Sequence, residues 1–233
     1  MRWRCVVADP RPFVPTYGAP PPVEECPNLR LLANYAIPAG RALMLRACGP
    51  NGEAAHNGFV WPSVPGSVVV CPDWRPEPVC GGGLHGWLHG EGDVGASDFA
   101  SRIDSLWLVV EVDAATVVEF ERKCKVPGGM VVASGKRAEV CGWLAGVLPC
   151  RSIVYGTATA GDGGTATAGY GGTATAGDGG TATAGDGGSI AVRWWDGQKG
   201  RYRLISADVG ENGIEANKPY HVVDGKLVAG KAL

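Results

Sequence analysis

The chain has 233 residues, of which 45% are hydrophobic, and this is enough for one large globular domain or two small ones. Its formal net charge of −2 and isoelectric point near 6.1 describe a nearly neutral surface. This balance argues against a nucleic-acid-binding protein and against a polybasic membrane patch, both of which need clustered lysines and arginines.

The N-terminal stretch MRWRCVVADPRPFVPTYG lacks the apolar core of a secretory signal, and the chain has no apolar run long enough for a membrane helix. We therefore expect a cytoplasmic protein without a membrane span. The eight cysteines are widely and irregularly spaced, which favours reduced thiols over a disulfide framework. Because prolines crowd residues 8–28, residues 1–28 are predicted to be an irregular, proline-rich lead-in.

Residues 29–150 are predicted to form an α+β domain made mostly of strands. The stretch RALMLRACGPNGEA indicates a strand, a turn and a return, and residues 67–71 form a further short strand between prolines. Residues 106–112, LWLVVEV, are apolar on both faces, as in a strand inside a sheet. In residues 134–149, apolar side chains recur at helical spacing between Ser134 as N-cap and Pro149 as stop, so a helix is predicted there.

The glycine-rich stretch CGGGLHGWLHGEGD, residues 80–93, is the main candidate for chemistry in this domain. It matches neither the P-loop pattern nor the dinucleotide-binding glycine pattern, but its backbone N–H groups could cradle a phosphate. The alternative is a structured glycine loop with polar side chains and no ligand. The ligand-binding candidates are Gly81, Gly82, Gly83, His85 and His89.

The same loop is similar to a loop of ADP-ribosyltransferase-like folds, in which a histidine binds the ribose of nicotinamide adenine dinucleotide. This similarity implies NAD as a cofactor. It also implies a catalytic constellation of Arg46, His85 and Glu111.

Two further chemistries use the cysteines near this loop. Thiolates and imidazoles are zinc ligands, and the spacing C-x8-C-x4-H-x3-H lacks the C-x2-C pair typical of structural zinc sites. The metal candidates are Cys71, Cys80, His85 and His89. Alternatively, Cys80 is a nucleophile with one of the two histidines as its base.

Residues 156–188 repeat the octad GTATAGDG four times, with Tyr170 in place of one aspartate. Threonine and alanine alternate, so each octad is predicted to be a short strand with a threonine face and an alanine face, followed by a glycine turn. Two octads would make one coil of a β-solenoid, with alanine inside and threonine outside. The outward array would be Thr157, Thr159, Thr165, Thr167, Thr173, Thr175, Thr181 and Thr183.

The predicted fold is therefore mainly β, with an α+β N-terminal domain, a short β-solenoid over residues 151–193 and a C-terminal β-hairpin cap over residues 194–233. Solenoid ends need covering, and Trp194 and Trp195 are placed to cover the alanine-lined end. The hairpins expected around residues 196–200 and 224–225 would complete the cap. The alternative reading of the repeat is a disordered glycine-rich spacer.

The stretch AGYGGTATAGDGGTATAGDGG is similar to the tandem repeats of bacterial ice nucleation proteins, which are built from 16-residue coils of two octads. That resemblance implies a β-solenoid whose threonine rows order water. The chain as a whole, through LVVEVDA, CGGGLHG, the octads and RWWDG, resembles a group of uncharacterised bacterial and phage proteins that carry GTATAGDG repeats.

Two classes of function follow from these patterns. The first is a non-enzymatic binding or structural protein that uses the repeat as a rigid scaffold and assembles with protein partners or with further copies through a solenoid edge. The second is a nucleotide-binding or ADP-ribosyltransferase-like enzyme built around the glycine loop. No cofactor is expected in the first class, and zinc or NAD in the second.

Overall fold

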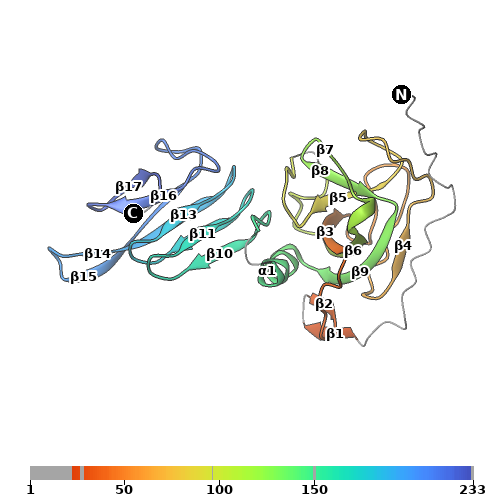
Figure 1. Cartoon of the computed structure of the whole chain (residues 1–233), viewed down its shortest axis with the longest axis horizontal. Coiled ribbons are helices and arrows are strands. Elements are labelled where there is room, and N and C mark those ends of the chain that lie inside the picture. Colours follow the sequence, from red (N-terminus) through yellow and green to blue (C-terminus); the bar gives the residue numbers. More distant parts are fainter. Residues whose placement is uncertain (1–22, 27–28, 96, 149–150, 232–233) are drawn as a thin grey trace, which may run out of the picture.

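The structure is a computed structural model that describes residues 23–26, 29–95, 97–148 and 151–231. Across these residues the protein is mainly β, with seventeen strands, one α-helix and one short 3-10 helix. Figure 1 shows strands β1 to β9 gathered in one body, strands β10 to β17 in another, and helix α1 between them. No helix in the described ranges is long and apolar enough to cross a membrane.

The first nine strands form one sheet in the order β1-β2-β9-β6-β3-β5-β8-β7, and β4 pairs with the other half of β9. All of these pairs are antiparallel. The strands are β1 Val23–Cys26, β2 Leu29–Leu32, β3 Arg41–Cys48, β4 Val68–Val70, β5 Leu84–Leu88, β6 Leu106–Asp113, β7 Val118–Phe120, β8 Lys123–Val126 and β9 Gly128–Gly135. The 3-10 helix η1, Ala114–Thr116, follows β6.

Two details differ from the sequence prediction. Strand β1 lies in the lead-in that we predicted to be irregular, because the four residues VEEC between Pro22 and Pro27 keep the N–H groups that a ladder needs. The helix is shorter than predicted: α1 spans Arg137–Val147, and its N-cap position is Lys136 rather than Ser134, which belongs to β9. The remainder of residues 1–28 lies outside the described residues.

Both faces of this sheet are buried. On one face, side chains such as Trp107 and Val109 of β6 pack with Val140 and Leu144 of α1. On the other face, Leu108, Val110 and Val112 of the same strand pack in a second core. Strand β6 is therefore apolar on both sides, as its sequence predicts, because it lies in the middle of the sheet between β3 and β9.

The octads alternate between two four-stranded sheets. Strands β10, β12 and β14 pair in parallel at intervals of sixteen residues, with Thr157 opposite Thr173 and Thr173 opposite Ser189. Strands β11 and β13 pair in the same way, with Thr165 opposite Thr181. The strands are β10 Thr157–Ala160, β11 Thr165–Thr167, β12 Thr173–Ala176, β13 Thr181–Thr183, β14 Ser189–Asp196, β15 Arg201–Asp208, β16 Tyr220–Val223 and β17 Lys226–Ala229.

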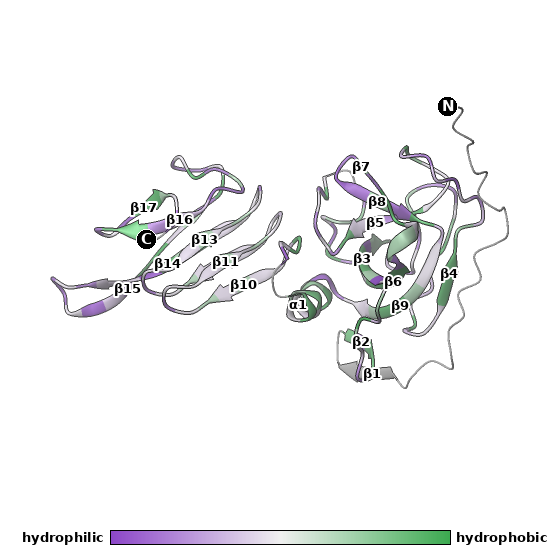
Figure 2. Ribbon diagram, viewed as in Figure 1, coloured by the Kyte–Doolittle hydropathy of each residue, from purple (hydrophilic) through white to green (hydrophobic). Residues whose placement is uncertain are grey.

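The two sheets of the repeat pack through their alanines. Ala166, Ala174 and Ala182, with their even-numbered neighbours, form one buried cluster, and the most exposed of them is only 3% accessible. In Figure 2, which is coloured by hydropathy, the Thr-Ala strands are pale because their residues have intermediate hydropathy. Strand β4 of the first body, which consists of three valines, is green and strongly hydrophobic. Because alanine is small, this thin core lets the two sheets approach closely.

The C-terminal end of the alanine cluster is covered differently from our prediction. Its larger members are Ile190, Val192, Ile214 and Tyr220, and the two tryptophans are not among them. Trp195 is 49% exposed and packs edge-on against Tyr202 of β15, at a centroid distance of 5.0 Å. Strands β15 and β16 run antiparallel to the last parallel strand of each sheet, so hairpins, not the tryptophan pair, end the stack.

A chain of aromatic rings joins the repeat to the first sheet. Tyr170 contacts Tyr155 at 5.9 Å between centroids, Tyr155 contacts Trp107 at 5.8 Å, and Trp107 stacks on Trp87 at 5.9 Å. The guanidinium of Arg137 in α1 lies 4.4 Å from the centre of the Tyr155 ring. The tyrosine that interrupts the octad pattern is therefore the one that faces the N-terminal body.

Candidate functional site

The glycine loop forms one wall of a cavity of about 330 Å³ on the first body. The opposite walls come from β3, from the segment that carries Phe59 and Trp61, and from Phe99. Side chains from segments far apart in the sequence thus meet here. The polar and aromatic groups that matter most are Arg46, Trp61, Cys80, His85, Phe99 and Lys123.

The loop is held from below by Lys125 of β8, whose side chain is fully buried. Its Nζ donates to the carbonyl of Val79 at 2.9 Å and to that of Gly81 at 3.0 Å. A Cβ at Gly83 would lie 2.8 Å from the Lys125 side chain, so glycine is required where the loop crosses it. Lys125 therefore fixes the position of the three glycines that line the cavity.

His85 and Arg46 stand side by side in the cavity. Arg46 Nη1 donates to the backbone carbonyl of His85 at 3.3 Å, and its guanidinium lies over the Trp61 ring at 5.4 Å. Arg46 Nε and His85 Nε2 are buried without a hydrogen-bond partner within the described residues. The pKa of His85 is lowered to about 4, first by burial and then by the positive charges of Arg46 and Lys123. The imidazole is therefore neutral at pH 7.

We expect the protein to lose stability as the pH falls from 6.5 towards 4. Because the pKa of folded His85 is lowered, the unfolded chain takes up a proton in this window that the folded chain does not. His85→Gln should therefore flatten the dependence of the urea midpoint on pH between 6.5 and 4. The exposed His56, replaced in the same way, is the control and should leave the slope as it is. Equal slopes for His85→Gln and the parent would contradict this assignment.

Glu111 does not join Arg46 and His85. Its carboxylate accepts from Arg41 Nε at 2.9 Å and from the Tyr35 hydroxyl at 2.7 Å. Odd-numbered residues of β6 face the helix side of the sheet, whereas Arg46 belongs to the opposite face. The constellation implied by the ADP-ribosyltransferase resemblance is therefore not assembled.

The zinc candidates are also not brought together. No group of three or more histidine, cysteine, aspartate or glutamate side chains in the described part of the chain is arranged to hold a metal. Cys71 Sγ donates to Asp73 Oδ1 at 3.2 Å, while Cys80 Sγ lies 3.0 Å from Lys123 Nζ. His89 is at the end of β5 with a left-handed backbone, φ 55°. The neighbour of Cys80 is thus Lys123, which no sequence pattern connects with it.

The cysteines with described side chains are free thiols. Burial raises the pKa of Cys48 and Cys71 to about 11 and that of Cys124 and Cys141 to about 12. These four are unreactive at neutral pH because the thiolate is the nucleophilic form. Cys80 is the exposed one, and it opens onto the cavity.

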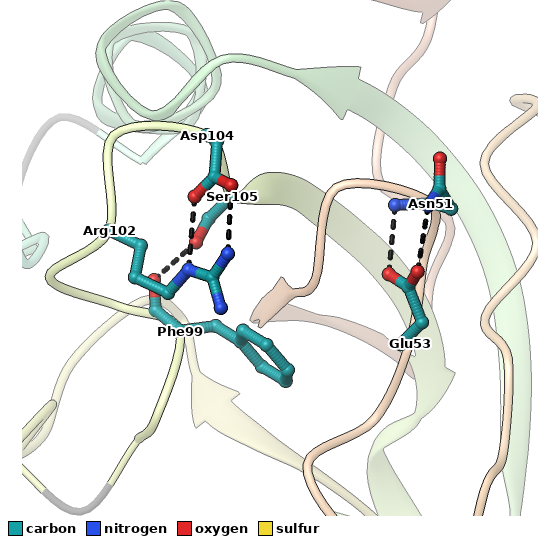
Figure 3. Close-up of polar contacts among 6 residues, drawn as sticks. All are labelled: Asn51, Glu53, Phe99, Arg102, Asp104 and Ser105. Carbon is teal, nitrogen blue, oxygen red and sulfur yellow. Dashed lines mark hydrogen bonds and ion pairs between the residues drawn. The ribbon is translucent and has the colours of Figure 1, made fainter.

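The loop that presents Phe99 to the cavity is fixed by polar contacts, as Figure 3 shows. Arg102 makes a two-pronged bond to Asp104, at 3.0 and 2.8 Å, and its guanidinium lies over the Phe99 ring at 5.6 Å. Ser105 Oγ donates to the Phe99 carbonyl. The nearby turn is closed by Glu53, which accepts from the side chain and the backbone of Asn51. These contacts therefore position the loop that carries Phe99.

The threonines of the repeat lie on two outer faces instead of forming one array. Because alternate octads belong to different sheets and the alanines face inward, the two threonine sets point in opposite directions. Thr181 departs from the pattern, since it is buried. Of the others, Thr157, Thr159, Thr165, Thr167 and Thr173 are exposed, and Thr175 and Thr183 are half-buried.

Comparison with known proteins gives one likeness. No family model and no solved structure matches the chain. Ice nucleation protein InaU of Pantoea ananas and an ice nucleation protein of Enterobacter agglomerans are each 35% identical to it over 81 residues. These residues are 35% of this chain but only 7% and 6% of the two relatives. The chain therefore resembles ice nucleation proteins over about a third of its length and spans a small part of theirs.

Proposed function

We propose that this is a non-enzymatic structural or binding protein in which residues 151–193 form a short β-solenoid that serves as a rigid scaffold. In this proposal the scaffold joins an α+β domain, residues 29–150, to a C-terminal β cap, residues 194–233. The observation that carries it is the parallel, in-register pairing of octads at intervals of sixteen residues around buried alanine. A stack of identical units extends by adding coils, which suits a spacer.

The likeness to ice nucleation proteins supports a structural role, since those relatives are named for ice nucleation and not for a catalysed reaction. Ordering water into ice would need a wide flat array. Here one outer face displays four threonines, on β10 and β12, and the other displays three, on β11 and β13, because Thr181 is buried. We therefore propose that the threonine faces are solvent-exposed surfaces of the scaffold and do not order ice. The edge strands of the two sheets, at which another protein or a second copy could pair, are β10, β11, β15 and β17.

The test is to lengthen the stack. Inserting a second copy of residues 173–188 adds sixteen residues, one full period, and should extend both sheets while leaving the melting temperature within a few degrees of the parent. Inserting only residues 181–188 is the matched control. That half period moves β14 to the wrong sheet, so we expect a broader and earlier melting transition.

Circular dichroism and calorimetry read out both insertions. If the two insertions melt alike, the repeat is a spacer without register, and the solenoid proposal fails. Droplet freezing supplies a second arm: the parent should freeze at the temperature of plain buffer. If the parent raises the freezing temperature and this rise disappears when the exposed threonines are replaced by lysine, the scaffold proposal is wrong and the protein is an ice nucleator.

A further inference from the structure

The cavity beside the glycine loop has the features of a binding site that the scaffold role does not use. Its volume of about 330 Å³ is at the lower end of the range for small-molecule sites. Phe59 and Trp61 pack edge to face at 5.8 Å between centroids, and Phe99 adds a third ring to the lining. These rings offer flat apolar surface, and the contacts that fix Phe99 and the glycine loop make the cavity preformed.

The polar groups of the cavity are set up for an acceptor. Arg46 Nε carries an N–H that is buried without a partner in the described structure, beside the equally unpartnered His85 Nε2. A buried donor without an acceptor costs free energy. Because Nε itself is buried, a ligand oxygen in the cavity would supply the acceptor once the Arg46 side chain turns towards it. The Arg46 guanidinium carbon lies over the Trp61 ring at 5.4 Å from its centre, and Nη1 donates to the His85 carbonyl at 3.3 Å, so the side chain is positioned by two contacts.

The charges around His85 favour an anion. Arg46, Lys123 and Lys125 act on it as positive charges, and Asp73 acts on it as a negative charge. The lining also carries the carboxylates of Asp73, Asp93 and Asp98. Asp73 accepts from the Cys71 thiol, Asp93 Oδ1 from the Gly95 N–H at 2.8 Å, and Asp98 Oδ2 lies 4.0 Å from His56 Nε2. Lys125 is bonded to two carbonyls and is not part of the lining, so the cations that line the cavity are Arg46, Arg75 and Lys123. Lys123 Nζ also lies 3.6 Å from Glu121 Oε2.

We propose that this cavity binds a small organic anion that carries a flat ring. The carboxylate or phosphate would sit between Arg46 and Lys123, and the ring would lie against Phe59 and Trp61. Cys80 Sγ lies 3.0 Å from Lys123 Nζ and lines the cavity, so the rate at which this thiol reacts with added reagents can be used to detect binding in the cavity.

The first test uses the charge of a thiol reagent. Iodoacetate and iodoacetamide have the same size, but only iodoacetate is an anion. At Cys80 we expect the ratio of the iodoacetate rate to the iodoacetamide rate to exceed the ratio for the urea-unfolded chain by about tenfold, because the cations concentrate the anionic reagent. Peptide-resolved mass spectrometry separates Cys80 from the other cysteines.

Lys123→Gln and Arg46→Gln should each lower this ratio, whereas Lys199→Gln, a surface lysine of the C-terminal part, should not. Lys123 is the safer variant for the fold, since its side chain is 20% exposed and on a strand near the sheet edge. A ratio for folded Cys80 equal to that of the unfolded chain overturns the proposal.

The second test measures whether the site requires an aromatic ring in the ligand as well as a negative charge. Phenyl phosphate and benzoate should slow the reaction of Cys80 with neutral iodoacetamide at concentrations where inorganic phosphate and benzyl alcohol do not. Comparison of phenyl phosphate with benzoate then tells which anionic group the site prefers. Equal protection by inorganic phosphate and phenyl phosphate would show a general anion effect and refute the ring-binding part. No protection by any of the four probes would refute the site.

Discussion

Replacing Tyr170 with aspartate, which restores the perfect octad, is expected to destabilise the contact between the repeat and the N-terminal body by about 2 kcal/mol. The variant loses the ring that packs on Tyr155 and places a carboxylate beside it. Tyr155 in turn contacts Trp107, which is fully buried in the first core. The most regular sequence should thus give the less stable protein.

The measurement is thermal unfolding followed by two signals. With Trp194 and Trp195 of β14 replaced by phenylalanine in every variant, tryptophan fluorescence follows the N-terminal part, which includes the Trp87–Trp107 pair, and circular dichroism follows all strands. In the parent we expect the two signals to change together. In Tyr170→Asp the strand signal should begin to change at a lower temperature, because the repeat is no longer held to the first core.

Two further variants control this experiment. Tyr170→Phe keeps the ring and should behave like the parent. Asp186 occupies the equivalent turn one coil further on, where its carbonyl accepts from the N–H of Gly171. The double variant Tyr170→Asp, Asp186→Tyr therefore keeps the composition but moves the ring away from Tyr155, and it should not recover stability. Recovery in the double variant would show that the ring acts through the repeat itself and not through the junction.

Replacing Glu111 with alanine is expected to lower the free energy of unfolding by about 3 kcal/mol. The side chain is almost fully buried and binds two partners, one of them the charged guanidinium of Arg41 at 2.9 Å. Without the carboxylate, Arg41 and Tyr35 lose the acceptor that they share, and the deleted side chain leaves a cavity in the core beside β6. Urea denaturation at pH 7 measures the loss.

The site beside the glycine loop gives the control for this second prediction. Because Glu111 faces the other side of the sheet, the folded Glu111→Ala protein should keep the reagent preference of Cys80 unchanged. Glu111→Gln retains an acceptor for Tyr35 and should cost about half as much as alanine. A stable Glu111→Ala protein with altered Cys80 reactivity would instead connect this carboxylate to the cavity.

Several features of the fold could be read from the sequence because their cause is local. The buried strand β6 follows from a run of apolar residues on both faces, and α1 from apolar residues at helical spacing. The octad pattern predicts which way each alanine points, because threonine and alanine alternate along each strand. These properties depend on residues that are only a few positions apart in the sequence, so a local sequence pattern is enough to predict them.

The candidate site could be predicted only in part. The glycines and His85 are conspicuous in the sequence, and they do line the cavity. Lys123 and Trp61 were missed, because nothing near either residue connects it with the loop. The K-C-K alternation on β8 was the available signal, since it puts both lysines on one face of a strand. Glu111 was grouped with Arg46 and His85 only through the resemblance to ADP-ribosyltransferase-like folds, and such a resemblance does not say which face of this sheet a side chain occupies.

The sequence by itself determined the local elements: strands, one helix, turns, and a repeat whose two faces differ. Only the tertiary structure decided which strands pair, and therefore that Lys123 meets Cys80 across 43 positions and that Glu111 stays apart from Arg46. The physical reason is that a β-sheet brings distant residues together through pairings that no local pattern encodes. Tyr170 illustrates both levels: the repeat marks it as an exception, and only its contact with Tyr155 explains the exception.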